Sequence, residues 1–302
     1  MRSLALVTDS SSALPTELLA ALLSAGGFAI ADLPVSIDNQ PVDSLDSMTV
    51  DEAIAMAHVQ GQQVTTSGVA PGALADIYED FAQQGFEGVV SVHLSGELSG
   101  TCDAAGLAAS MVDIPVAVVD SLNLAMGLGE PVARLHRLLA EEGDLERASL
   151  LAEELCSSTE LFFFIPTLDA LKRGGRVSPA LAMVGQMFQI RPVATVLDGK
   201  LSYLERPRTT AKAIECLVAL THDACSKRSG ELPLDITLET SEARSLIQRA
   251  GRVVAIHYSG NVEQAKELKT RLGQVAEQAQ LSPLPPVLAA HAGLGALATV
   301  VL

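Results

Sequence analysis

The first 160 residues alternate short apolar runs with segments of helical periodicity, and this alternation limits the possible folds more than any other feature. Apolar runs such as LALVT (4–8) and GVVSVHL (88–94) predict buried strands. PGALADIYEDFAQQG (71–85) has its apolar residues at helical spacing. Strands that alternate with helices form parallel βαβ units with helices on both faces of the sheet. The sequence therefore predicts an N-terminal α/β domain over residues 1–160.

Residues 161–302 follow a different pattern, in which strands outnumber the helices between them. We expect a C-terminal α+β domain here, because the apolar runs come as hairpins and glycine turns rather than as βαβ units. Asp198-Gly199 predicts the turn of a hairpin. The predicted strands lie in RPVATVLDGKLSYLER (191–206), LDITLE (234–239), RVVAIHYSG (252–260) and PPVLAAHAGLGALATVVL (285–302), the last read as strand, glycine turn and strand.

Charge is distributed unevenly along the chain, whose net charge is -16. Residues 1–170 carry 4 basic and 25 acidic residues, whereas residues 171–302 carry 16 basic and 11 acidic ones. An acidic chain of this kind does not suit nucleic acid as a partner. The basic residues concentrate between Lys172 and Lys212. This segment is either an ordinary solvated face or a dock for a phosphate, an acidic partner or an anionic surface.

The composition argues against several other classes of protein. The four cysteines lie far apart without a CxxC pair, and the histidines show no metal-ligand spacing, so neither a disulfide scaffold nor a metal site is predicted. No motif for a cofactor stands out. Although 48% of the residues are hydrophobic, no run of eighteen is free of polar residues. We expect a protein of the reducing cytoplasm.

Hydroxyl-rich turns follow three of the predicted N-terminal strands, at Asp9-Ser10, at Ser95 and at Asp120-Ser121. The segment TTSGVAPG (65–72) adds further hydroxyls before a helix. In sheets of this class, ligands bind outside the carboxyl ends of the strands, where helix N-termini favour anions. The sequence therefore predicts a site for a small anionic group, unless these residues merely cap helices.

A catalytic alternative stays open at this point. GELSG (96–100) does not match the G-x-S-x-G pattern of a nucleophile elbow. His291 nevertheless stands in a run of alanine and glycine, at the end of a predicted strand, where an imidazole can bond a ligand oxygen. A serine-dependent acyl hydrolase or transferase that uses Ser95 or Ser99 with His291 is the alternative function. A third is a regulatory domain that senses another small anion.

Six segments in order resemble the DegV family of bacterial fatty-acid-binding proteins. LVTDSSSALP resembles the family's opening Asp-Ser turn, and HLSGELSGT its Ser-Ser-x-Leu-Ser-Gly-Thr turn. LDALKRGGRVS is similar to its Leu-x-x-Leu-x-x-Gly-Gly-Arg loop, and HAGLGALA to its terminal His-x-Gly-Pro-Gly. TTSGVAPGAL and VVDSLNLAMGLG resemble its Thr-Ser-Gln-Pro-Ser-Pro and Asp-Ser segments.

The resemblance implies two α/β domains with a long-chain fatty acid held between them. It implies a carrier rather than an enzyme, which presents the bound carboxylate to a separate kinase subunit for phosphorylation. The basic segment would then dock the kinase, or contact a membrane surface transiently, and would stand apart from the lipid cavity. The matching fatty-acid-binding positions are Thr66, Ser67, Ser95, Gly96, Ser99 and His291, with Arg208 at a basic position after the hairpin.

Several positions depart from the family's pattern. Gly96 stands where the second serine of the family's pair is expected, which removes a hydroxyl available to the carboxylate. Gly68 replaces the glutamine, and Leu294 the last proline. If the missing hydroxyl matters, Gly96→Ser is expected to tighten binding. The adaptable methionines of LAMVGQMFQI (181–190) suit an apolar slot for the acyl chain.

Overall fold

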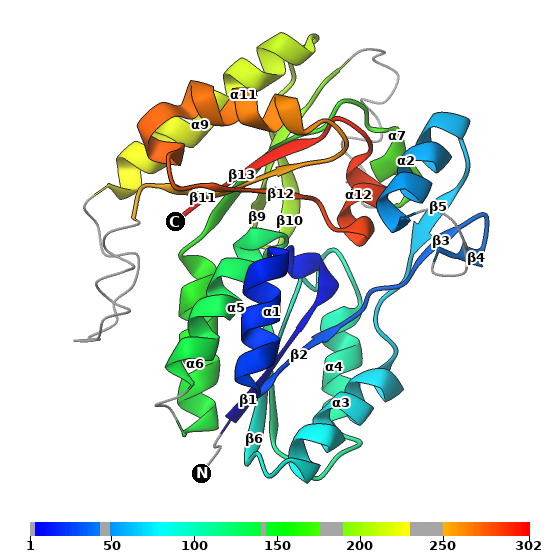
Figure 1. The fold of residues 1–302 in the computed structure, drawn as a ribbon, viewed down its shortest axis with the longest axis vertical. Coiled ribbons are helices and arrows are strands. Elements are labelled where there is room, and N and C mark those ends of the chain that lie inside the picture. The colour runs from blue at the N-terminus through cyan, green and yellow to red at the C-terminus, as the bar shows by residue number, and fades with distance from the viewer. Residues whose placement is uncertain (1–3, 43–48, 140–142, 176–189, 230–249) are drawn as a thin grey trace. The chain divides into compact units, whose positions relative to one another are not determined.

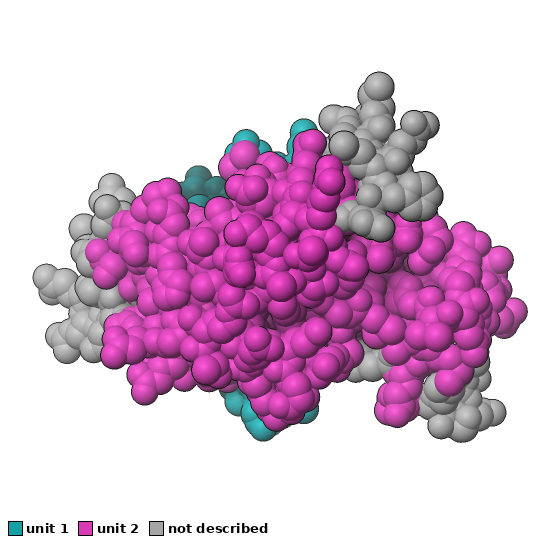
Figure 2. Space-filling view, turned by 90° about the horizontal axis from the view of Figure 1, so that it is seen from above, with its two compact units in different colours: residues 1–33, 67–159, 198–200 teal, residues 34–66, 160–197, 201–302 magenta. Residues whose placement is uncertain are grey.

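The structure, a computed structural model, describes residues 4–42, 49–139, 143–175, 190–229 and 250–302 (Figure 1). The chain divides into two compact units (Figure 2). The break after Thr159 lies next to the predicted boundary at residue 160, but residues 34–66, predicted to lie in the first domain, pack with the second unit. Unit 1 comprises residues 1–33, 67–159 and 198–200, and unit 2 comprises residues 34–66, 160–197 and 201–302.

The sheet of unit 1 has four parallel strands in the order β2-β1-β6-β7. Every residue of β1 and β6 is buried, as expected for central strands of a parallel sheet that is covered on both faces. This confirms the predicted α/β class of the N-terminal region. The strands are β1 (Leu4–Asp9), β2 (Phe28–Ala31), β6 (Gly88–His93) and β7 (Val116–Asp120), and the short η1 (Ser10–Ser12) follows β1.

Helices cover both faces of this sheet (Figure 1). In α3, Pro71 occupies the first turn, and Leu74, Tyr78 and Phe81 form the buried stripe that helical spacing predicts. The helices α1, α5 and α6 pack together on one face, and α3 and α4 pack together on the other. Their bounds are α1 (Thr16–Ala25), α3 (Pro71–Gln83), α4 (Thr101–Ala109), α5 (Met126–Leu138) and α6 (Leu145–Ser157).

Unit 2 contains a mixed sheet of six strands in the order β10-β9-β8-β13-β11-β12. β8 pairs antiparallel with β9 and β13, β13 pairs antiparallel with β11, and β11 pairs parallel with β12. The predicted hairpin is confirmed: Asp198 and Gly199 have φ of 48° and 76°, the two positive values that a type I′ turn requires. The strands are β8 (Glu160–Phe164), β9 (Val193–Leu197), β10 (Lys200–Glu205), β11 (Val253–Tyr258), β12 (Gln280–Pro283) and β13 (Leu297–Val301).

Two helices, α9 (Thr210–Arg228) and α11 (Val262–Leu272), pack on this sheet, and the short η3 (Gly273–Ala276) follows α11. Phe162 and Phe164 of β8 and Leu268 of α11 belong to the core cluster that joins them. This apolar core holds the sheet in place, and with it β13 and the end of the segment that leads into β13.

The rest of unit 2 is a small group of elements around α12 (Pro286–Ala292), which contacts α2, α7, β3 and β5. The prediction of a strand before the glycine turn was wrong, because residues 286–292 are helical. Pro286 suits a first helical turn, and Gly293, with a φ of 75°, ends the helix. The other elements are β3 (Val35–Ile37), β4 (Gln40–Pro41), α2 (Val50–Gln60), β5 (Val64–Thr66) and α7 (Asp169–Arg173), and the strands form an antiparallel sheet in the order β4-β3-β5.

Some sequence predictions fall outside the described residues. These are the strand LDITLE (234–239) and residues 181–189 of the proposed acyl-chain segment. Among the helices that the structure describes, none combines the length and apolar character needed to cross a bilayer.

Candidate functional site

Unit 2 brings two of the predicted ligand residues into direct contact. Thr66 is the last residue of β5, and His291 lies in the last turn of α12. Thr66 Oγ1 and His291 Nε2 are 2.7 Å apart, a hydrogen bond between residues 225 positions apart in the sequence. Both side chains are half-buried. Two positions that the family resemblance assigns to the ligand therefore contact each other, and His291 sits on a helix and not at the predicted strand end.

A second histidine holds α12 in place. His58 of α2 donates from Nε2 to the carbonyl oxygen of Ala289, at 3.2 Å. Burial lowers the pKa of His58, and the positive charge of Arg173 lowers it further, while the hydrogen bond to Ala289 opposes both. His58 therefore acts as a neutral donor that joins α2 to the turn of α12 carrying His291.

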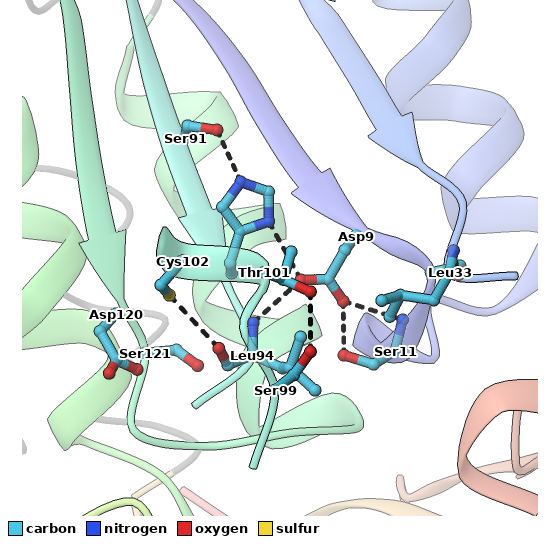
Figure 3. Close-up of polar contacts among 12 residues, drawn as sticks. Asp9, Ser11, Leu33, Ser91, Leu94, Ser99, Thr101, Cys102, Asp120 and Ser121 are labelled. Carbon is cyan, nitrogen blue, oxygen red and sulfur yellow. Dashed lines mark hydrogen bonds and ion pairs between the residues drawn. The ribbon is translucent and has the colours of Figure 1, made fainter. Parts of the chain in front are cut away.

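In unit 1, a chain of buried hydrogen bonds runs from α3 to the carboxyl ends of β6 and β1. Figure 3 shows the part of this chain from Ser91 to Asp9. The Tyr78 hydroxyl lies 2.8 Å from Ser91 Oγ, which lies 2.8 Å from His93 Nε2. His93 Nδ1 lies 3.1 Å from Asp9 Oδ2. A carboxylate can only accept, so His93 Nδ1 is the donor to Asp9. Burial raises the pKa of Tyr78 to about 12, which keeps its phenol a donor.

Asp9 is the centre of this network. Besides the proton of His93, it accepts the amide of Leu94 at 2.9 Å, and the amide and hydroxyl of Ser11 at 3.0 and 2.5 Å (Figure 3). Two of these four donors, from His93 and Leu94, tie the end of β1 to the end of β6, just before Ser95. The sequence analysis noted Asp9 but missed His93, whose signal was a histidine inside a buried strand.

The order serine, histidine, aspartate in this network is that of a hydrolytic triad. Ser91, His93 and Asp9 are nevertheless 0% exposed. A nucleophile has to meet its substrate, and Ser91 Oγ meets Tyr78 instead. The arrangement is therefore a structural brace for the turn that follows β6.

That turn, which carries Ser95, Gly96 and Ser99, uses its backbone amides within the protein. The amide of Ser95 donates to the carbonyl of Asn123, and those of Leu98 and Ser99 to the carbonyl of Ser95. The amide of Gly96 donates to Asp120 Oδ2 at 3.0 Å, and the amide of Glu97 to Ser95 Oγ at 3.2 Å. The amides of residues 95–99 thus stabilise the turn itself and do not form a cradle for an anion.

The hydroxyls of the turn differ in their partners. Ser95 Oγ is buried and donates to the carbonyl of Gly199 at 2.8 Å. Ser99 Oγ lies 2.8 Å from Thr101 Oγ1, in the first turn of α4 (Figure 3). One bond between two hydroxyls uses one of their two protons, so the other is available to an acceptor. Gly68, next to the exposed Ser67, approaches Thr101, which brings the predicted Ser67 and Ser99 segments together.

Gly96 has a role that the sequence analysis did not foresee. Asp120, at the end of β7, accepts from the amides of Gly96 and Leu122. A Cβ at position 96 would lie 2.9 Å from Asp120 Oδ2, closer than a carbon atom normally approaches. Because Gly96 has no side chain, the carboxylate of Asp120 can approach and accept from the Gly96 amide. The glycine therefore has a structural role of its own, besides lacking a serine hydroxyl.

Arg208 and the cysteines contribute less to this picture. Arg208 lies on an exposed bend between β10 and α9, and within the described ranges it forms no hydrogen bond with Thr66 or His291. Burial, and the nearby carboxylates of Asp120 and Asp9, raise the pKa of Cys102 to about 12, so its thiol is not a nucleophile near neutral pH. In the part of the chain that the structure describes, His, Cys, Asp and Glu do not gather into a group that could hold a metal ion.

Comparison with known proteins gives a consistent result. A family model described as "Uncharacterised protein, DegV family" matches residues 3–302. A DegV domain-containing protein of Streptomyces coelicolor is 33% identical over 303 residues, covering 99% of this chain and 98% of the relative. The structure titled "Fatty Acid Binding of a DegV family Protein from Thermus thermophilus" matches with a TM-score of 0.80 and 29% identity, over 99% of this chain and 98% of that one. The structure of a DegV family protein from Corynebacterium glutamicum matches with a TM-score of 0.75 and 25% identity, over 99% and 97% of the two chains.

Proposed function

Because the chain belongs to the DegV family, we propose that it binds a long-chain fatty acid without acting on it chemically. The observation that carries the proposal is the likeness, along 99% of the chain and at 29% identity, to a Thermus thermophilus protein described as binding fatty acid. The contact between Thr66 and His291 adds a local reason, since it joins two of the positions that the family resemblance assigns to the carboxylate.

The proposed ligand suits the chemistry of these residues. A hydroxyl and an imidazole, both half-buried, can donate to a carboxylate that is partly withdrawn from water. Each methylene of the tail that leaves water contributes roughly 0.8 kcal/mol, so a sixteen-carbon tail contributes on the order of 10 kcal/mol before ordering costs. We assign the carboxylate first to Thr66 and His291, and propose Ser67 and Ser99 as further donors.

The other predicted positions receive different roles in this proposal. Ser95 and Gly96 shape the turn through Gly199 and Asp120, so we expect them to act on binding indirectly. Arg208 remains a proposed contact with the anionic end of the ligand or with a partner.

We extend the proposal to presentation of the bound carboxylate to a separate kinase subunit in the cytoplasm. The family resemblance motivates this step, and the exposed Lys172 and Arg173 at the end of α7 offer positive charge for docking a kinase or touching an anionic membrane surface. Reversal of both charges to glutamate is expected to slow phosphorylation of bound fatty acid, more at low salt than at high salt.

The serine-hydrolase alternative gains no support from the contacts of its two candidate nucleophiles. Ser95 Oγ donates to the carbonyl of Gly199, and Ser99 Oγ pairs with the hydroxyl of Thr101. Neither partner is a base that could remove the proton of a serine.

Native mass spectrometry of the purified chain tests the proposal. We expect a complex whose added mass is released as free fatty acid on denaturation. An acyl group that stays attached after denaturation would support the hydrolase alternative. A chain that carries no lipid and takes up none from a mixture of sixteen- and eighteen-carbon fatty acids would contradict the proposal.

A further inference from the structure

The two glycines of the LKRGGR segment stand in different backbone conformations. Gly174, which follows α7, has a φ of -72° and a ψ of -10°, values that alanine adopts readily. Gly175 has a φ of 72°, in the left-handed region that favours glycine. The backbone therefore explains Gly175 but not Gly174.

The space around Gly174 supplies the missing reason. A Cβ at position 174 would lie 2.7 Å from Cε1 of His291 and closer still to Nδ1 of the same ring. Real carbon atoms do not approach so closely, so any side chain at position 174 would displace the imidazole. Gly174 and His291 both belong to unit 2, where α7 contacts α12.

The imidazole is not free to move aside without losing a bond. Its Nε2 lies 2.7 Å from Thr66 Oγ1, and its helix is held by the bond from His58 to Ala289. Rotation away from position 174 would separate Nε2 from the Thr66 hydroxyl. A side chain at 174 and the contact between Thr66 and His291 therefore exclude one another.

We propose that Gly174 is a positioning residue for the carboxylate-binding pair, and that its lack of a side chain is what lets His291 reach Thr66. The inference rests on the proposed function for its ligand, but not for its geometry. It also divides the LKRGGR segment, which the sequence analysis had assigned as a whole to partner docking. The first glycine serves the ligand site and the second glycine serves the turn, while Lys172 and Arg173 are the exposed side chains to which we assign partner docking.

The first test needs no ligand and uses the full chain. Gly174→Ala, His291→Ala and the double variant are unfolded in urea, with circular dichroism as the readout. We expect Gly174→Ala to lower the urea midpoint in the natural background. In the His291→Ala background the ring is gone, and the same change should leave the midpoint unchanged or raise it, because alanine restricts the unfolded chain more than glycine does.

The second test measures binding of palmitate by calorimetry. We expect Gly174→Ala and His291→Ala each to weaken binding tenfold or more, and the double variant to bind no more weakly than His291→Ala alone. Gly175→Ala is the matched control from the same loop. It strains a left-handed residue, yet among the described residues nothing lies within 4 Å of the added carbon. It should cost stability while changing palmitate affinity less than twofold.

The imidazole of His291 gives a readout that a general loss of stability would not move. Its ring nitrogen shifts, assigned in ¹⁵N-labelled protein through the His291→Ala variant, should change in Gly174→Ala and stay unchanged in Gly175→Ala. If Gly174→Ala fails to fold, the double variant should fold, since the clash has been removed.

Three results would overturn the proposal: equal effects of Gly174→Ala in both backgrounds, wild-type affinity of Gly174→Ala, or unfolding of the double variant. Failure of the proposed function is a separate outcome. In that case neither the natural chain nor any variant binds palmitate. The urea comparison still decides whether Gly174 positions the ring of His291.

Discussion

Two clusters in this molecule each pair a histidine with a side-chain hydroxyl, and they differ in their access to solvent. In unit 1, His93 is 0% exposed and uses both ring nitrogens inside the protein, toward Asp9 and Ser91. In unit 2, His291 is half-buried and meets a threonine hydroxyl. The first cluster has the residue types of a catalytic triad and is a brace, whereas the second has an ordinary composition and is the ligand site that we propose. Exposure, more than residue type, separates structural from functional polar groups.

The largest expected effect comes from breaking the buried cluster. Asp9→Ala removes the acceptor of four hydrogen bonds and leaves the amides of Leu94 and Ser11 buried without it. A buried donor left without its acceptor typically costs about 1–3 kcal/mol of the free energy of unfolding, so the loss of an acceptor shared by several buried donors is expected to cost about 3 kcal/mol or more. Urea unfolding measures this loss.

Asp120→Ala is the matched control, because Asp120 also accepts from two amides but is only half-buried. Water can replace part of what it provides, so we expect a loss of about 1–2 kcal/mol. Equal losses for the two variants would show that burial does not distinguish the clusters.

Acid provides the next test, through a third histidine. His257 is buried on β11 beside the hydroxyl of Ser282. Burial lowers its pKa from 6.5 to about 4, and a hydrogen bond with the backbone of Ser282 opposes this shift. Between pH 4 and pH 6.5, His257 is protonated in the unfolded chain but not in the folded chain. The free energy of unfolding is therefore expected to fall as the pH drops from 6.5 to 4, by an amount on the order of 3 kcal/mol.

His257→Gln should flatten this part of the stability curve relative to that of the natural chain. Unfolding in urea at a series of pH values measures both slopes. A His257→Gln slope equal to that of the natural chain would assign the acid sensitivity to other groups.

The half-buried cluster is broken by His291→Ala. We expect weaker palmitate binding by about 1.5–3 kcal/mol, the range for a hydrogen bond to a charged group, with the free energy of unfolding nearly unchanged. His93→Ala is the contrasting variant, because we expect it to lower mainly the free energy of unfolding, whereas His291→Ala should lower mainly palmitate affinity. Calorimetry and urea unfolding of both variants decide the matter, and unaltered palmitate affinity in His291→Ala would remove that residue from the site.

The smallest effect concerns Gly96. The sequence alone suggested that Gly96→Ser restores a ligand hydroxyl, but its Cβ would crowd Asp120. We now expect a loss of about 1 kcal/mol in stability and no gain in palmitate affinity. Gly106→Ser is the control, since among the described atoms an added carbon there meets nothing within 4 Å. Tighter binding by Gly96→Ser would restore the original expectation.

Local patterns carried most of what the sequence could predict. Central parallel strands are buried on both faces, so the sequences of β1 and β6 are apolar runs that predict strands. The dipeptide Asp198-Gly199 was sufficient to predict a hairpin turn. The short apolar run of α12 was ambiguous, since seven residues fit a strand as well as a helix. The assignment of Thr66 and His291 to the ligand came from family resemblance, and their contact with each other was not predicted, because no spacing rule reaches across 225 residues.

Long-range packing explains what the sequence could not show. The grouping of residues 34–66 with unit 2 depends on contacts such as His58 with Ala289, which lie 231 positions apart. The close approach of Gly174 to His291 is of the same kind. A local pattern reflects the spacing of neighbouring residues along one helix or strand, and it carries no information about contacts between residues far apart in the sequence.

The membership of residues 34–66 in unit 2 has a consequence for the order in which the chain can fold during synthesis. The helix α2 leaves the ribosome early, but α12, against which it packs, is made more than 200 residues later. At about 5–20 residues per second, this is a wait of roughly 10–45 s. Throughout that time Met56 and Val59, which are largely exposed even in the finished protein, belong to a segment without its partner. This insertion is therefore open to aggregation or chaperone capture until α12 has been made.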